Sequence, residues 1–289
     1  MSILIDEIIE KIKAEFNEPE PKWEHKEVSV NDIIFLKGEC EKDSEFDPHN
    51  KRKQMLKNLA NQKAIVLNIS CNYGQVFAAF EEGLNGKDVP WGLWGRILRM
   101  YSDKGSTPFK IFLLANNHLR EFPPNTDAIT PHNINGGYTY RCNRETIVIY
   151  RAEDATRVLL HELMHSCCVD KPENGIDIME AETEAWAELM YVAFLSQGKK
   201  YLFNDLLKRQ SEWMRKQNEE VKKHMKNSDS REFPWRYTIG KQEVWERWGI
   251  LRHEDLKPYI QIKDSLRLTF PPSKTIKDRF KVRNTSTIL

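Results

Sequence analysis

The sequence predicts an α+β protein in which a small mixed sheet is followed by a mostly helical C-terminal half. Two apolar runs, AIVLNIS at 64–70 and PFKIFLLANN at 108–117, have the length and composition of buried strands. Two shorter runs, GYTYRC and ETIVIYR, are typical of a hairpin. Long segments with helical spacing then extend from residue 154 onward. This order of elements is typical of an α+β domain.

Apolar spacing and chain breakers predict the elements before the hairpin. An N-terminal helix ends before Pro19 and carries five apolar residues at helical spacing: Ile5, Ile8, Ile9, Ile12 and Phe16. The segments that follow predict one strand within 28–38, a helix over 52–62, and helices over 75–84 and 90–102. Pro90 lies near the first turn of the last of these helices. Residues 122–135 are rich in Pro, Asn and Thr, and they predict a loop.

Two consecutive helices follow the hairpin. Asp154 can cap the first helix, and Gly198 ends the second, which we expect over 177–197. Charged helical sequence continues over 200–226 and 242–251. Three ranges result: an N-terminal helix with a turn-rich extension (1–63), the α+β domain (64–200) and a mostly helical subdomain with a basic tail (201–289).

Composition narrows the classes of function. Charged residues make up 30% of the chain and nearly cancel to a net charge of +1, so there is no strong nucleic-acid signal. Only the C-terminal stretch is basic, with eight Lys or Arg from Lys257 onward against Asp264 and Asp278. We expect a solvated, partly flexible tail, and the alternative is an arm that docks on an acidic partner.

The cysteines and the length of the apolar runs indicate the cellular compartment of the protein. An odd number of cysteines without a disulfide framework favours reduced thiols: Cys40, Cys71, Cys142, Cys167 and Cys168. The first 16 residues resemble an amphipathic helix rather than a signal peptide, because acidic residues lie within the apolar stripe. No run approaches the roughly 18 apolar residues that cross a bilayer. We therefore expect a cytoplasmic protein that does not associate with membranes.

Residues 161–165 read HELMH and suggest a metal site. Positions four apart lie on one face of a helix, so His161 and His165 can present two imidazoles to one ion. Glu162 is turned about 100° from His161, where it can accept a proton from a water that the metal activates. The surrounding RVLLHELMHSCC is apolar, and buried polar groups need partners. The alternative is a core histidine pair that backbone carbonyls satisfy.

A third ligand is expected, since catalytic zinc usually has three protein ligands. Glu180, Glu184 and Glu188 share one face of the second helix at four-residue spacing, whereas Glu182 points elsewhere. HELMH followed by Glu184 resembles the gluzincin class of zinc metallopeptidases. This resemblance implies one Zn²⁺ per chain, held by His161, His165 and Glu184. Glu180 is the second choice if the linker between the two helices packs tightly. The resemblance also implies that Glu188 hydrogen-bonds His161 and fixes its tautomer, and the alternative for Glu188 is a solvated helix acid.

The resemblance extends to the hairpin before the motif. In zincins an edge strand pairs with bound peptide, and GGYTYRC and TIVIYR stand in the corresponding order. It implies a zincin-like domain with a substrate-binding edge at Gly137, Tyr138, Thr139 and Tyr140. An ordinary hairpin is the alternative. The same region is similar to uncharacterised HExxH proteins of large cytoplasmic DNA viruses.

Other zinc classes match less well. Metzincins continue as HExxHxxGxxH, but Cys168 and Lys171 occupy the corresponding positions here. The GxMEN signature of gluzincin aminopeptidases is absent. Cys167 and Cys168 adjoin the motif, but they point away from the histidine face, and we expect them to pack in the core.

The residues and the resemblance together predict a zinc-dependent endopeptidase that acts on a protein or peptide, with Glu162 as general base. A further donor would stabilise the oxyanion, and the candidates are His224, Tyr237 and His253. One alternative is a structural or virion-associated protein on a zincin scaffold with inert or absent zinc. Another is a peptidase specialised for one terminus of one partner. Glu162 favours hydrolysis, because inert zinc needs its ligands but not the base.

Overall fold

The computed structural model describes residues 3–227, 231, 233–251, 262 and 264–278. The chain divides into two compact units that alternate along the sequence. We call residues 19–118, 135–167 and 272–289 the sheet unit, and residues 1–18, 119–134 and 168–271 the helical unit. Each is described by itself. The three domain ranges expected from the sequence stay a prediction, and the α+β class with a helical C-terminal half is confirmed.

The sheet unit is built on a six-stranded mixed sheet with the order β1-β2-β3-β4-β6-β5. β2 pairs antiparallel with β1 and β3, the run β3-β4-β6 is parallel, and β5 lies antiparallel to β6 at the edge. The strand bounds are β1 Glu24–His25, β2 Ala64–Cys71, β3 Gly74–Glu81, β4 Phe109–Ala115, β5 Gly137–Thr139 and β6 Ile147–Ile149. The predicted strands at 64–70 and 108–117 and the hairpin are therefore confirmed.

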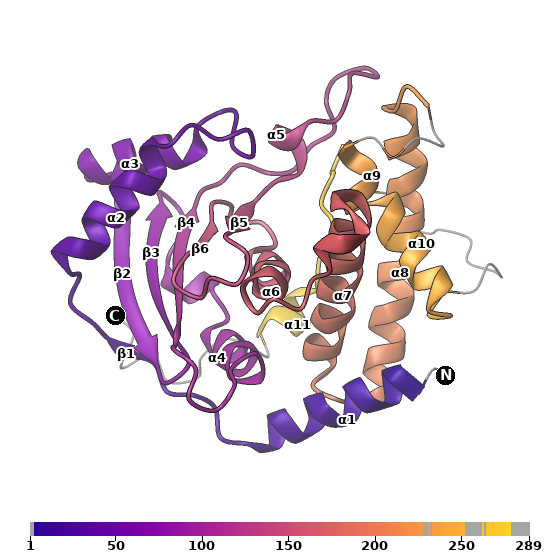
Figure 1. Cartoon of the computed structure of the whole chain (residues 1–289), viewed down its shortest axis with the longest axis horizontal. Helices are drawn as coiled ribbons and strands as arrows, with labels where there is room; N and C mark the ends of the chain where they lie inside the picture. The colour runs from indigo at the N-terminus through magenta and orange to yellow at the C-terminus, as the bar shows by residue number, and fades with distance from the viewer. Residues whose placement is uncertain (1–2, 228–230, 232, 252–261, 263, 279–289) are drawn as a thin grey trace. The chain divides into compact units, whose positions relative to one another are not determined.

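Helices cover both faces of this sheet, which is why its central strands are apolar on both sides. Figure 1 shows α2 (Val30–Glu41) and α3 (Lys51–Ala60) on one side and α6 (Ala155–Ser166) on the other. Phe77, Phe112 and Val148 pack under the α2–α3 layer. The remaining helical segments of this unit are η1 Gly86–Asp88, α4 Trp91–Met100 and α11 Lys274–Asp278.

Two elements of the sheet unit differ from the prediction. Residues 28–38 do not form a strand but the start of α2, because Ser29 caps this helix by accepting the Asp32 amide at 3.1 Å. Residues 75–84 do not form a helix, because the tight turn after Cys71 brings Gly74 back as the first residue of β3. The predicted helices at 52–62 and 90–102 are confirmed as α3 and α4.

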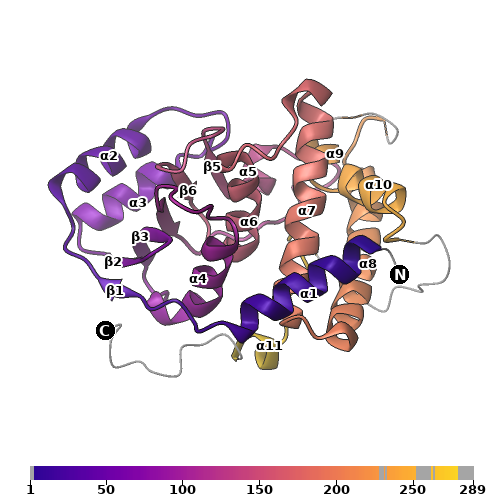
Figure 2. The ribbon, with the colours of Figure 1, turned by 60° about the horizontal axis from the view of Figure 1, so that its bottom comes forward.

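In the helical unit, α7 (Ile176–Ser196) contacts α1 (Ile3–Asn17), α8 (Lys200–Lys223), α9 (Phe233–Tyr237) and α10 (Ile239–Arg247). Figure 2 shows α1 crossing α7. α1 buries Ile5, Ile8, Ile9 and Ile12, as its spacing predicts. The predicted loop at 122–135 ends in the single turn α5 (Pro131–Ile134), and η2 (Pro172–Asn174) precedes α7.

Two further predictions concern the chain ends and the membrane. Within the residues that the structure describes, every helix is too short or too polar to cross a bilayer. Much of the basic stretch after Lys257 lies outside the described residues, so both interpretations of that tail stay predictions.

Candidate metal centre

Helix α6 carries the HELMH residues, and its apolar side holds it against the sheet. Leu159, Leu160 and Leu163 are buried, and the helix packs on β5 and β6. Asp154 occupies the predicted cap position, but its side chain does not accept a hydrogen bond from the helix, so only the position of the cap is confirmed. Because the leucines fix the rotation of the helix, the motif residues have fixed directions.

His161 and His165 lie one turn apart with their ring nitrogens facing each other. The two Nε2 atoms are 3.1 Å apart, and both side chains are about nine-tenths buried, with residue exposures of 8% and 9%. Two zinc–nitrogen bonds of about 2.0–2.1 Å at a tetrahedral angle would separate the nitrogens by about 3.4 Å. The separation allows a hydrogen bond between the two imidazoles, and it is also close to the separation that one shared metal ion would require.

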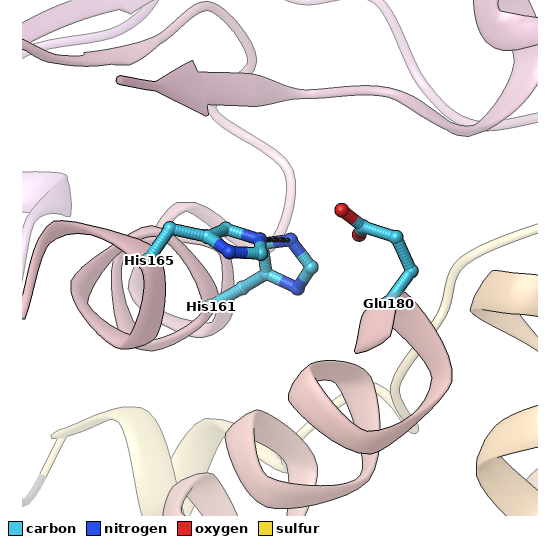
Figure 3. A group of neighbouring side chains, drawn as sticks. All are labelled: His161, His165 and Glu180. Atoms are coloured by element: carbon cyan, nitrogen blue, oxygen red, sulfur yellow. Dashed lines mark hydrogen bonds between the residues drawn. The ribbon is translucent and has the colours of Figure 1, made fainter. Parts of the chain in front are cut away.

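Glu180, from the first part of α7, completes a group of three residues that could hold a metal. One ligand atom from each of His161, His165 and Glu180 lies within 4.8 Å of the others, and Figure 3 shows the three side chains. Two imidazoles with one carboxylate form a donor set that suits zinc. Glu180, the second choice for the third ligand, is thus the glutamate that lies near the two histidines.

Glu184, the preferred third ligand, is not a member of this group among the described residues. It lies one turn further along α7 and is buried. Counting residues from HELMH cannot fix which turn of α7 faces the histidines, because that depends on how the linker folds. Here the linker contains η2 and a left-handed Gly175 with φ of 81°. Glu184 as a ligand stays a prediction.

Glu162 lies between α6 and the edge strand β5, and its residue is only 4% exposed. A β-carbon at Gly137 would lie 3.1 Å from Glu162 Oε1, 2.6 Å from Val158 Cγ1 and 2.9 Å from the Val148 carbonyl oxygen. Only glycine fits this close approach of strand and helix. The carboxylate of the predicted base is therefore adjacent to the main chain of the edge strand.

The main chain of β5 offers groups for pairing on its outer side. Residues 137, 138 and 139 pair with 149, 148 and 147, and the Tyr150 amide donates to the Gly136 carbonyl at 2.8 Å. In this antiparallel register, Tyr138 bonds to β6, while the N–H and C=O groups of Gly137 and Thr139 point away from it. Among the described strands, residues 137–139 lie at the sheet edge, and Tyr140 follows directly after them, while a role of this edge in substrate binding stays a prediction.

Glu188 belongs to a buried ionic cluster in the helical unit. Lys241 Nζ donates to it at 3.1 Å and Thr269 Oγ1 at 2.7 Å, and the Glu188 and Lys241 side chains are both 0% exposed. The alternative of a solvated helix acid is therefore wrong, while a hydrogen bond to His161 stays a prediction. Sequence reasoning missed Lys241 and Thr269, because an isolated lysine in a charged helix resembles a surface residue.

The three candidate oxyanion donors differ in their burial and in whether the structure describes them. His224 is half-buried at the end of α8, where its Nδ1 lies 2.8 Å from the Asp127 carbonyl and its ring stacks on Phe122. Tyr237 is buried at the end of α9. His253 lies outside the described residues. An oxyanion role for any of them stays a prediction.

The expectation of reduced cysteines is wrong for two of the five. Cys142 and Cys168 are disulfide-bonded, whereas Cys40, Cys71 and Cys167 are free. Cys142 lies in the turn between β5 and β6, and its amide donates to the His165 carbonyl at 2.9 Å. The turn between β5 and β6 therefore lies at the end of α6. The spacing of the cysteines in the sequence does not predict this proximity. Core packing is thus not the role of Cys168, and the cytoplasmic location stays a prediction.

Comparison with known proteins adds no family to this geometry. No family model, no curated protein and no solved structure matches the chain. The relation to gluzincins therefore remains a resemblance carried by the motif residues.

We expect one zinc ion per chain at His161, His165 and Glu180, and we expect Glu180 to contribute more to its binding than Glu184 does. His161→Ala or His165→Ala should abolish stoichiometric zinc, measured by elemental analysis of protein purified without chelators. Glu180→Gln should weaken zinc binding by more than the roughly 10–100-fold that outer-sphere changes cost. Glu184→Gln is the matched control, and a larger loss from Glu184→Gln than from Glu180→Gln would reassign the third ligand.

The buried Glu188–Lys241 pair predicts a large effect on stability. Lys241→Met leaves Glu188 without this cation in the core, so the free energy of unfolding should fall by about 3–5 kcal/mol. The double variant Lys241→Met/Glu188→Leu should recover most of the loss. Lys208→Met, at an exposed site on α8, is the control. Equal denaturation midpoints for Lys241→Met and Lys208→Met would contradict the role of the pair.

Proposed function

We propose that the protein is a zinc-dependent peptidase that hydrolyses peptide bonds in a protein or peptide substrate. His161, His165 and Glu180 would hold the zinc ion, and Glu162 would act as the general base. The observation that carries the proposal is the position of Glu162. Its carboxylate lies against Gly137, in the strand whose outer main-chain groups are directed away from the sheet.

The edge strand β5 suits an extended peptide as substrate. A peptide that adds to an exposed edge gains main-chain hydrogen bonds that do not depend on its sequence. Gly137 and Thr139 offer those groups on the outer side of β5. Because Glu162 contacts the strand at Gly137, a peptide paired there would pass beside the carboxylate. A zincin-like organisation of the sheet unit is part of this proposal.

The chemistry divides between the ion and Glu162. A bound zinc ion supplies Lewis acidity, which activates water and polarises a carbonyl group. Glu162 accepts the proton of the attacking water and then delivers it to the leaving amine. Its burial between α6 and β5 restricts the carboxylate to a few orientations, which favours both transfers.

The position of Glu162 also weighs against a purely structural zinc site. A structural ion needs a closed set of protein ligands, and it needs no carboxylate beside an open strand edge. His161 and His165 serve either function equally well. Glu162 and Gly137 together therefore favour hydrolysis over a scaffold with inert metal.

Replacing the proposed base separates metal binding from chemistry. Glu162→Gln keeps the shape of the side chain but cannot accept the proton, so kcat should fall by about 10²–10⁴-fold with zinc stoichiometry unchanged. The assay follows cleavage of a broad peptide library by mass spectrometry. Glu145→Gln, in the exposed β5–β6 turn, is the control. A zinc-loaded wild type that cleaves no peptide, or an active Glu162→Gln variant, would refute the proposal.

Gly137 predicts a second, steric effect on the same site. Gly137→Ala places a methyl group against Val158, the Val148 carbonyl and Glu162, so β5 and α6 must separate. The variant should lose about 1–3 kcal/mol of stability and most of its peptidase activity. Gly38→Ala, within α2 where a β-carbon meets nothing within 4 Å, should be neutral or stabilising. Comparable unfolding midpoints and activities for the two variants would contradict this packing.

A further inference from the structure

Tyr138, the middle residue of β5, faces the α2–α3 layer, while the missing side chain of Gly137 faces α6. This alternation follows from the two-residue period of a strand. The Tyr138 hydroxyl donates to Glu39 Oε2 at 2.9 Å and accepts from Arg52 Nη1 at 3.0 Å. A single hydroxyl thus links the edge strand to α2 through Glu39 and to α3 through Arg52.

Arg52 is a rigid partner for this hydroxyl. Its residue is 2% exposed, and Nε donates to Asp47 Oδ2 at 3.1 Å. Nη1 and Nη2 donate to the backbone carbonyls of Glu39 at 2.6 Å and Lys42 at 2.9 Å. Asp47 in turn accepts the backbone amide of Arg52 at 3.1 Å. All three guanidinium nitrogens are therefore fixed, and a planar guanidinium held this way has little freedom to move.

A second contact joins the end of β5 to the same carboxylate. The Tyr140 hydroxyl donates to Glu39 Oε2 at 3.3 Å, and Lys42 forms an ion pair with Glu39. Glu39 is buried, so its carboxylate oxygens need hydrogen-bond donors such as these. The two tyrosines that flank Thr139 therefore share one buried acceptor on α2.

The edge strand needs such an attachment because its own pairing is short. β5 has three residues and pairs with β6 alone among the described strands. Short edge strands with few ladder bonds lie at the low-stability end of a fold. Gly137 adds backbone freedom at the residue that contacts Glu162. The hydroxyl links on the opposite face compensate for both weaknesses.

We propose that Glu39, Arg52 and Tyr138 are positioning residues that hold β5 at a fixed distance from Glu162. This deepens the proposed peptidase function and rests on it for its catalytic consequence. The Tyr138 side chain, which joins the cluster to β5, lies on the face of the strand opposite the one that Gly137 turns toward α6. The cluster acts through the strand, by keeping the outward groups of Gly137 and Thr139 in place for a substrate main chain.

Tyr138→Phe tests the proposal, because it removes the hydroxyl and keeps the ring. Hydrogen exchange of the amide at position 138 of β5, which pairs with Val148 in the ladder, should accelerate about tenfold. The exchange rates of the β3 and β4 amides should stay unchanged. Zinc stoichiometry should stay at the wild-type value. In a peptidase assay kcat/KM should fall roughly 10–100-fold, since small misplacements are costly in catalysis. Tyr201→Phe, exposed on α8, is the matched control.

Glu39→Gln is the second variant, because it keeps an acceptor for the Tyr138 hydroxyl. It should retain slower exchange at position 138 than Glu39→Ala. Exchange at 138 that is unchanged in Tyr138→Phe, or that rises equally across the whole sheet, would overturn the positioning role. If exchange rises locally but wild-type protein cleaves no peptide, the anchoring of β5 stands and the peptidase function fails. The two failures are thus distinguishable.

Discussion

The candidate site depends on the close packing of α6 on the edge strand at Gly137. A β-carbon there would overlap Val158 and the Val148 carbonyl, so the strand and helix can approach this far only where the side chain is missing. The approach brings the Glu162 carboxylate to the main chain of β5. Together with the buried leucines of α6, this contact fixes the rotation of the helix and so the direction of its two imidazoles, whose Nε2 atoms lie 3.1 Å apart. The proposed base, the two proposed histidine ligands and the proposed substrate edge thus depend on this contact between α6 and β5, whereas the third proposed ligand, Glu180, comes from α7.

The two faces of β5 make different contacts, because successive side chains of a strand point to opposite faces of the sheet. Gly137 faces α6, which packs too closely for a side chain at this position. Tyr138 faces α2 and α3, where Glu39 and Arg52 bind its hydroxyl. Buried polar groups on that second face are stable only as a fully bonded set, because each missing partner would leave a desolvated charge. The same constraint applies in the helical unit, where Lys241 and Thr269 hold Glu188. In both units, buried charged side chains are held by bonded partners, with Glu39 and Arg52 beside Tyr138 of β5 and Lys241 beside Glu188 of α7.

Local patterns in the sequence predict the helix that carries HELMH, the hairpin before it and the long helix after it, since periodicity and motif spacing are local properties. They fail where tertiary context decides. Residues 75–84 have helix-compatible composition, but the turn after Cys71 makes them a central strand. Ser29 makes a helix of an apolar segment that resembles a strand. The choice between Glu180 and Glu184 depends on how the linker folds, and Arg52, Lys241 and the disulfide-bonded Cys142 have partners far away in the sequence, so no spacing rule finds them.

We propose that the α6 imidazole pair belongs to a metal site with nitrogen and carboxylate ligands. Zinc-edge X-ray absorption spectroscopy of the zinc-loaded protein tests it most directly, because it reports the ligand atoms without requiring a substrate. We expect a shell of nitrogen and oxygen ligands at about 2.0–2.2 Å, with the outer scattering of two imidazole rings and no sulfur. A shell with sulfur at about 2.3 Å, or protein that retains no zinc, would contradict it.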